Sequence, residues 1–224
     1  MRKFSFIHAV TVITIALSPL YAHAQKKPKP YPYPPGGFSQ STPVSTGTIA
    51  RLMLNPMGEV DGFLLKEDVQ IKFPPHMTAE LVAVVGVGDT VSIQGFTEYS
   101  GAVKAYAITN IRTGQSVVEH PPEPNRLPRH LRGATLQEMS AQGHVTKILK
   151  GPKGDPNGVL LDDGTIVRFP PHIGFQNAQL LQPGQIFAVR GYGTQNQYGR
   201  ALEATAMGPS ASALQPFYNT AAQR

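Results

Sequence analysis

One five-residue pattern that could carry chemistry occurs twice in the chain, as Lys72-Phe-Pro-Pro-His76 and as Arg168-Phe-Pro-Pro-His172. A histidine near a cation could act as a metal ligand or a proton carrier. A metal site needs several convergent ligands, and no other His, Asp or Glu recurs as the same residue around both patterns. We therefore interpret the phenylalanine as a core residue, the prolines as the end of a strand, and the histidine as a turn cap. His76 and His172 remain weak metal candidates.

Aromatic residues near the ends of two expected strands form a second candidate site. An aromatic ring beside a cation suits a sugar, a single-stranded nucleic acid or a peptide. The alternative is that these rings close the end of a barrel. The candidate ligand-binding residues are the rings Phe96, Tyr99, Tyr192 and Tyr198, and the cations Lys72 and Arg168, which should point outward from a neighbouring strand.

Motifs for common enzyme classes are absent from the sequence. It contains no His-Glu-x-x-His, no Gly-x-Ser-x-Gly and no phosphate-binding loop. Asp162 and Asp163 are adjacent on an expected hairpin turn, so they cannot flank one substrate as an acid and base pair would. The chain also has no cysteine, which excludes a disulfide scaffold and a thiolate metal site. We expect a non-enzymatic protein with no catalytic residues and no cofactor.

The N-terminus has the layout of a secretory signal peptide. Two basic residues near the start precede an apolar stretch over residues 4–20, and Ala22 and Ala24 supply the small residues of a cleavage site. This pattern predicts a signal peptide over residues 1–24. The alternative is an uncleaved anchor, but the apolar run is short for a span of about 20 residues. No later segment reaches that length, so we expect a periplasmic or secreted protein with no transmembrane segment after signal cleavage.

The charge of the chain is modestly positive. Lys plus Arg is 20 and Asp plus Glu is 14, a net charge of +6. Much of the excess lies in a proline-rich segment over residues 25–44, which contains three lysines, whereas residues 45–117 are net negative. Neutralising phosphates takes several Lys and Arg on one surface. Nucleic acid is therefore a possible but disfavoured partner.

Two long stretches of the chain align without a gap at a spacing of 96 residues. Residues 47–96 and 143–192 share 12 identical residues in 50 positions, where ordinary composition would give about three. Glycine and proline total 43 of 224 residues, which favours turns and short strands over long helices. The alignment predicts the duplication of one domain of about 70 residues, a size that can fold alone.

Each copy contains five short apolar segments typical of strands, with a short helix or irregular cover expected at 78–85 or 175–181 between the third and fourth. Strand–strand–strand–cover–strand–strand is the order of the OB-fold, a partly open five-stranded barrel. We therefore expect an all-β fold of two tandem OB-like barrels with short cover helices. The expected segments are a signal peptide (1–24), a basic Pro-rich linker (25–44), domain 1 (45–117), a linker (118–141) with one or two helical turns at 134–141, domain 2 (142–212) and a flexible tail (213–224).

The sequence resembles exported bacterial OB-fold-like proteins. The residues that carry this resemblance are Gly58 with Asp61-Gly62 before the second strand, the two Phe-Pro-Pro-His ends, and the fourth strand from Val91 to Gly95. In the second copy Asn157 replaces the aspartate. The resemblance covers about 140 residues and implies a binding or assembly role.

Three functions follow as hypotheses. The leading one is a binding or envelope-interaction module whose partner is an envelope protein or a saccharide. The first alternative is single-stranded nucleic-acid binding, and the second is divalent-metal handling through His76 and His172. The sequence identifies neither the ligand, nor the orientation of the barrels, nor the oligomeric state.

Overall fold

The structure is a computed structural model that describes residues 44–123 and 136–218, all within one compact unit over Gln40–Arg224. The expected signal peptide, almost all of the expected basic linker, and residues 124–135 and 219–224 lie outside the described residues. The described residues form two closed five-stranded β-barrels with a few short helices, as the sequence predicted.

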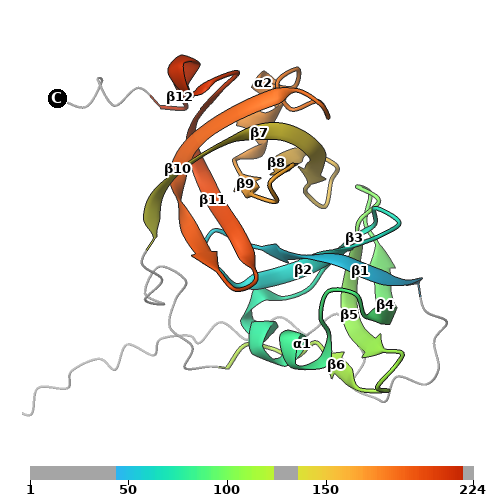
Figure 1. Cartoon of the computed structure of the whole chain (residues 1–224). Helices are drawn as coiled ribbons and strands as arrows, with labels where there is room; N and C mark the ends of the chain where they lie inside the picture. The colour runs from blue at the N-terminus through green and yellow to red at the C-terminus, as the bar shows by residue number, and fades with distance from the viewer. Residues whose placement is uncertain (1–43, 124–135, 219–224) are drawn as a thin grey trace, which may run out of the picture. The chain divides into compact units, whose positions relative to one another are not determined.

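Five strands close the first barrel because each one pairs with two neighbours. β1 pairs with β2 and β4, β2 with β3, and β4 with β5, all in antiparallel register. The parallel pairing of β3 with β5 completes the ring (Figure 1), which is the strand arrangement of the OB-fold. The strands are β1 (Ser45–Leu54), β2 (Val60–Leu65), β3 (Gln70–Lys72), β4 (Thr90–Thr97) and β5 (Val103–Asn110), and β6 (Ser116–Val118) adds to β5 outside the ring.

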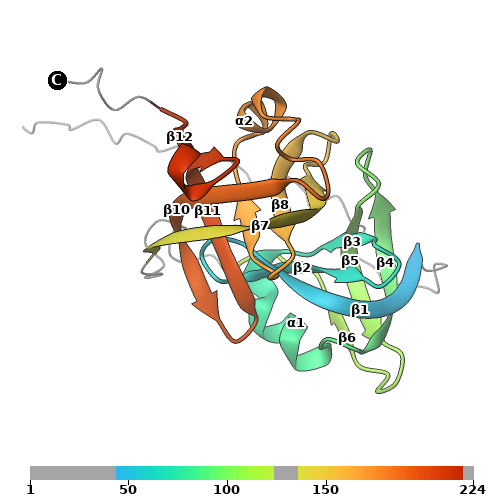
Figure 2. The same ribbon diagram turned by 45° about the horizontal axis from the view of Figure 1, so that its top comes forward.

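The second barrel repeats this arrangement with a longer first, fourth and fifth strand. β7 pairs with β8 and β10, β8 with β9, and β10 with β11, while β9 runs parallel to β11 and closes the ring (Figure 1). Figure 2 shows β7, β10 and β11 of this barrel from another side. The elements are β7 (Gln137–Lys150), β8 (Pro156–Leu161), β9 (Ile166–Arg168), β10 (Ile186–Asn196) and β11 (Gly199–Gly208), followed by the 3-10 turn η3 (Ala211–Ala213) and β12 (Gln215–Pro216).

A short helix follows the third strand of each barrel because two prolines end that strand. Proline cannot donate to a strand ladder, but it fits the first turn of a helix. In the first barrel η1 (Pro75–Met77) leads into α1 (Thr78–Val84), and Met77 and Leu81 are buried against the barrel. In the second barrel α2 covers Pro171–Gln176. The cover expected over 175–181 is therefore mostly irregular, because the helix starts directly at the prolines and turns follow it.

The repeated glycine of the fourth strand marks a β-bulge in both barrels. The register of β4 against β5 shifts between Gln94 and Gly95, and that of β10 against β11 shifts between Arg190 and Gly191. A Cβ atom at Gly95 or Gly191 would overlap a carbonyl oxygen of the partner strand. Because a bulge sharpens the bend of a strand, this glycine allows a short sheet to close on itself.

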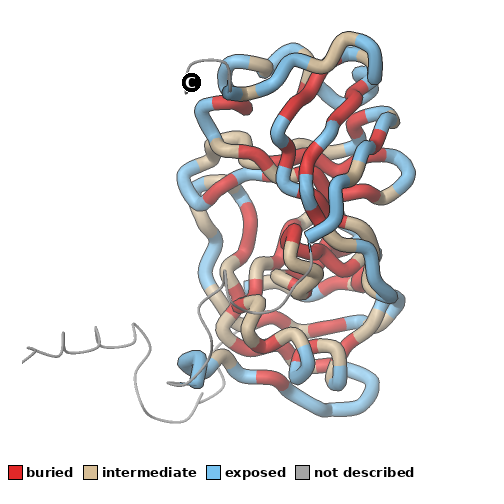
Figure 3. Tube along the Cα trace, turned by 90° about the vertical axis from the view of Figure 1, so that its left-hand side faces the viewer, coloured by how far each residue is buried: buried red, intermediate tan, exposed pale blue. Residues whose placement is uncertain are grey.

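Each barrel has its own interior of apolar side chains. Figure 3 shows buried and exposed segments alternating along the chain, as expected where one face of each strand points inward. Phe63 and Phe187 are fully buried and lie in the first and second interiors respectively. Phe73 and Phe169 of the repeated motif are also core residues, which confirms the structural interpretation of these phenylalanines.

The segment between the barrels is shorter than the composition suggested. β7 begins at Gln137, so residues 137–141 are strand and not the helical turns that we expected. The physical reason is that these residues pair with residues 189–193 of β10, and this ladder outweighs a weak local helix preference. In the expected flexible tail, Gln215 pairs with Met207 of β11.

Candidate functional site

The outer face of β3, β5 and β4 brings one predicted ring and one predicted cation to the same surface of the first barrel. Lys72 of β3 lies beside Lys104 of β5, and Lys104 lies opposite Phe96 of β4. Side chains at paired positions point to the same face of a sheet. The ring of Phe96 is 49% exposed, so this face offers an accessible aromatic group beside two lysines.

Glutamates neutralise both lysines of this face. The Nζ atom of Lys72 donates to Glu98 at 2.6 Å, and the Nζ atom of Lys104 donates to Glu119 at 3.2 Å. The two glutamate side chains are each only 9% exposed. Such pairs present hydrogen-bonding groups without a net charge. The face therefore suits a neutral polar ligand better than a phosphate chain.

The second barrel has a related face with a different charge pattern. Register places Arg168 of β9 beside Glu203 of β11, and Glu203 opposite Tyr192 of β10, whose ring is 47% exposed. The guanidinium of Arg168 donates to Asp61 of the first barrel at 3.1 Å. Arg168 therefore forms part of the contact between the barrels, while Tyr192 remains accessible.

The two remaining predicted rings lie in the hairpins between the fourth and fifth strands. Tyr99 is 92% exposed, and its ring lies next to the backbone of Gly154 in the second barrel. Tyr198 is partly buried and packs against the first barrel's core and against a cluster between the barrels. The six candidate residues therefore do not gather into one site. Phe96 and Tyr192 lie on separate outer faces, and Tyr198 contributes to packing.

An apolar cluster joins the two barrels. Leu64 and Leu160, at equivalent positions of β2 and β8, are 6% and 7% exposed and belong to the same cluster. The other buried members are Met53, Leu54, Leu149, Ile166 and Ala201. This cluster buries the outward face of the second strand of both barrels.

Polar contacts across the barrels obey an approximate two-fold relationship. Arg51 donates to the carbonyl oxygen of Gly164 at 3.0 Å, and Lys147 donates to the carbonyl oxygen of Asp68 at 2.9 Å. Lys147 is the repeat equivalent of Arg51, and Gly164 is that of Asp68. A contact in which residue i meets j and the equivalent of i meets that of j is isologous, as in a symmetric dimer.

This contact uses the surfaces through which OB-folds commonly bind ligands. Those surfaces are the face of strands two and three and the loops after strands one and four. In addition to the β2 and β8 faces, the β10–β11 hairpin reaches the loop after β1. Thr194 and Asn196 donate to the carbonyl oxygens of Pro56 and Gly58 at 3.2 and 2.9 Å. Each barrel therefore covers part of the usual ligand surface of the other.

The first of the two weak metal candidates lies in a small histidine cluster. The Nε2 atom of His76 donates to the carbonyl oxygen of His120 at 2.7 Å, and the His120 ring lies 3.0 Å from a carboxylate oxygen of Glu80. His172 is exposed on α2. No group of three His, Cys, Asp or Glu residues that could hold a metal occurs among the described residues.

Both ring nitrogens of His120 face acceptors, the carbonyl oxygen of Pro121 and the carboxylate of Glu80. Only the protonated imidazole can donate to both at once. Both hydrogen bonds raise the pKa of His120 above its usual value, and the bond to Pro121 has the larger effect. The sequence carried no signal for this residue, because His120 has no equivalent in the second repeat and follows the last strand of the first barrel.

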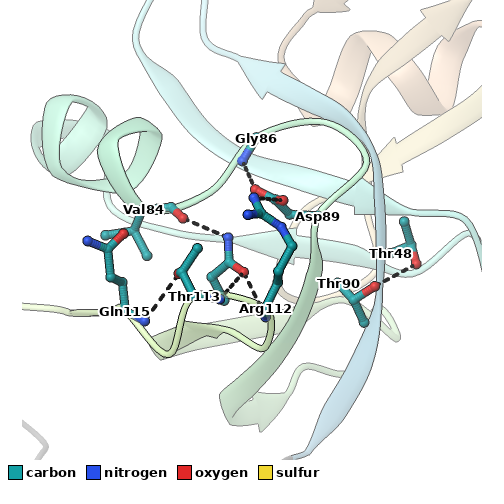
Figure 4. A network of polar contacts seen from close by, with 9 residues as sticks. Thr48, Val84, Gly86, Asp89, Thr90, Arg112, Thr113 and Gln115 are labelled. Carbon is teal, nitrogen blue, oxygen red and sulfur yellow. Dashed lines mark hydrogen bonds and ion pairs between the residues drawn. The ribbon is translucent and has the colours of Figure 1, made fainter.

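A polar network at the end of α1 has a structural role. Asn110, which is 1% exposed, donates to the carbonyl oxygen of Val84 and accepts from the backbone N–H of Arg112. Figure 4 shows Asp89 in the same network, where its carboxylate accepts from the backbone N–H of Gly86 and from the Arg112 guanidinium. These contacts lower the pKa of Asp89. The network fastens the helix to the ends of β4 and β5.

Comparisons with known proteins identify no family for this chain. No family model matches the chain, and no curated protein matches it. A solved structure that resembles it is a deletion mutant of the single-stranded DNA binding protein from Thermus aquaticus, with 14% identity and a TM-score of 0.25. The match covers 80% of this chain and 95% of that one. A likeness this weak supports no inference about shared function. Separately, none of the helices in the described residues has the length and apolar character to cross a bilayer.

Proposed function

We propose that this chain is a non-enzymatic binding protein of the cell envelope that recognises saccharides through the outer faces bearing Phe96 and Tyr192. The observation that carries the proposal is the half-exposed ring of Phe96 beside two lysines that are already paired with glutamates. A flat apolar ring packs against the apolar face of a sugar, and neighbouring ion pairs can hydrogen-bond its hydroxyls. OB-folds include oligosaccharide binders.

The ion pairing of four barrel cations argues against nucleic acid as the ligand of these two faces. Lys72, Lys104, Lys147 and Arg168 all lie within ion-pair distance of a carboxylate. A protein that binds a phosphate chain needs free cations along its path, because counterion release drives that association. The structural likeness to a DNA-binding protein is too weak to offset this argument.

Two ring-bearing faces on one chain favour a polymeric partner. The barrels are held together by the apolar cluster around Leu64 and Leu160 and by paired polar contacts, so the faces keep a set spacing. A polymer that contacts both faces at once binds more tightly than one that contacts a single face, because the second contact forms within the same complex. Export follows from the signal-peptide pattern of residues 1–24 and would place the protein beside envelope polymers.

The test is a calorimetric titration of the purified protein with chito- and cello-oligosaccharides and, in a separate arm, with oligo-dT at low salt. Phe96→Ala combined with Tyr192→Ala should weaken saccharide binding about tenfold or more, since each ring supplies about 0.5–1.5 kcal/mol of contact. Phe175→Ala is the matched control, because Phe175 is 63% exposed but lies on α2. Binding of oligo-dT in preference to every saccharide would overturn the proposal, as would equal saccharide affinity in the double variant.

A further inference from the structure

Two pockets flank the contact between the barrels and occupy equivalent positions. The first encloses about 150 Å³, and its lining includes Asp68, Gly101 and Lys147. The second encloses about 340 Å³, and its lining includes Arg51 and Arg200. Arg51 is the equivalent of Lys147, so each pocket receives a cation at this position from the barrel that faces it. Lys150, at the end of the same strand as Lys147, adds a second cation to the first pocket.

The equivalent residues differ in charge between the two pockets. Asp68 of the first pocket corresponds to Gly164 in the second by the spacing of 96 residues. Pairing of β3 with β5 and of β9 with β11 aligns Val103 with Leu202, which makes Arg200 the equivalent of Gly101. Lys150 of the first pocket has the apolar Leu54 as its equivalent. At these positions the second pocket has therefore lost a carboxylate and a lysine and gained a guanidinium.

Most hydrogen-bonding groups of the two guanidiniums have no acceptor among the residues that the structure describes. Arg51 donates from Nη1 to the carbonyl oxygen of Gly164, and Arg200 donates from Nη2 to that of Ser140 at 2.6 Å. The buried Nε atom of Arg200 has no hydrogen-bond partner. Among the described residues no carboxylate lies within 4.0 Å of either guanidinium, whereas Lys147 in the first pocket pairs with Asp68.

One carboxylate lines the second pocket, and its oxygens are engaged elsewhere. Asp163 accepts from the backbone N–H of Thr165 at 2.8 Å and from its hydroxyl at 2.9 Å. The amide of Asn196 is also used, since it donates to Gly58 and accepts from the backbone N–H of Tyr198. The pocket lining contains two arginines and one aspartate, so its net charge is positive.

We propose that the pocket between Arg51 and Arg200 binds an oxyanion, a phosphate or a carboxylate, that bridges the two barrels. Guanidinium groups present planar pairs of donors that match both kinds of oxyanion. A pocket of about 340 Å³ has room for the oxyanion and for part of a molecule that carries it. This site is separate from the faces of Phe96 and Tyr192, so its test does not depend on the saccharide proposal.

A bridging oxyanion should strengthen the contact between the barrels. Arg51 belongs to β1 of the first barrel and Arg200 to β11 of the second, so one ligand touches both. A ligand that binds only the folded state raises its stability in proportion to the logarithm of its concentration. Binding and thermal stability therefore report on the same site.

The test measures affinity by calorimetry and melting temperature at constant ionic strength, with inorganic phosphate, glycerol 1-phosphate and acetate as three separate probes. The first two probes distinguish a free ion from a phosphate ester, and acetate tests the carboxylate. The wild type should bind at least one probe and melt at a higher temperature with it. Arg200→Gln should weaken that binding about tenfold or more, because it removes a charge-assisted contact.

The matched control is Arg190→Gln, which removes an exposed arginine of β10 outside this pocket and should bind as the wild type does. Gly164→Asp is a second variant, which restores the acid of the first pocket beside Arg51 and should also abolish binding. Circular dichroism confirms that each variant is folded. Failure of the wild type to bind any probe would overturn the proposal, and so would equal affinities in folded Arg200→Gln and the wild type.

Discussion

Arg51 of the first barrel donates a 3.0 Å hydrogen bond to the carbonyl oxygen of Gly164 in the second barrel. Lys147 of the second barrel donates to the carbonyl oxygen of Asp68 in the first barrel, which repeats this contact in the opposite direction. Lys147 lies 96 positions after Arg51, and Asp68 lies 96 positions before Gly164. The duplicated chain therefore carries an isologous interface within a single polypeptide. Because that interface covers the second strand of each barrel, any ligand of the folded chain must use other surfaces.

The apolar cluster between the barrels should carry much of the stability of their contact. Leu64→Ala removes a 6% exposed side chain from this cluster, and buried Leu to Ala changes cost about 2–5 kcal/mol. We expect a loss within this range in a urea unfolding experiment. Val87→Ala, at a 65% exposed position, is the control and should change the unfolding free energy by less than about 0.5 kcal/mol. A Leu64→Ala variant as stable as this control would contradict the interface described here.

The glycine of the fourth strand should not tolerate a side chain. Gly191→Ala places a Cβ atom against the carbonyl oxygen of Glu203, and the backbone of the bulge would have to move. We expect a loss of about 1–3 kcal/mol in thermal unfolding. The control is Gly86→Ala, where the nearest atom to a Cβ is a side-chain oxygen at 3.9 Å. Equal melting temperatures for the two variants would show that the barrel closes without a tight bulge.

The pairing of His120 with Glu80 should make a small, pH-dependent contribution to stability. The pKa of His120 is raised in the folded protein by the carbonyl oxygen of Pro121 and by the Glu80 carboxylate. Its contribution is therefore full below the unfolded value of about 6.5 and is lost as the pH rises through the higher folded pKa. The side chains of His120 and Glu80 are 48% and 51% exposed, so solvent screening limits it to under about 1 kcal/mol.

Glu80→Gln tests this contribution. NMR titration of His120 should give a lower pKa in the variant than in the wild type, and the variant should be less stable than the wild type at pH 5 but not at pH 9. Glu67→Gln, which removes an exposed carboxylate elsewhere in the first barrel, is the control. An unchanged His120 titration in Glu80→Gln would show that Glu80 does not contribute to the raised pKa of His120.

The strand order of both barrels was predictable because its signals are local. Alternation around Ile71 and Phe73, the two prolines that follow them and the glycine near the end of the fourth strand each act within a few residues of the chain. Each of these signals occurs again in the second copy, so both copies predict the same strand order. Helix limits were less predictable, since α2 begins at Pro171, ahead of the helix or irregular cover expected over 175–181.

The location of Leu64 shows what local patterns missed. Leu64 and Leu65 are adjacent and both buried, so one points into the barrel and the other away from it. Two neighbouring apolar residues in a strand indicate that both of its faces are covered. Met53 and Leu54 of β1 are also adjacent and buried, and both belong to the cluster between the barrels. This signal was present, but it does not say which surface provides the cover.

The amino-acid sequence alone determined the repeat, the barrel topology and the candidate rings, because periodicity and turn residues act over short distances along the chain. Only the tertiary structure decided that Arg168 donates to Asp61, that Tyr198 packs against the core of the first barrel, and that Arg51 and Arg200 line one pocket. Those pairs lie far apart in sequence and meet only when one barrel packs against the other. Such packing depends on the complementary shape and charge of two whole surfaces, which no short stretch of residues encodes.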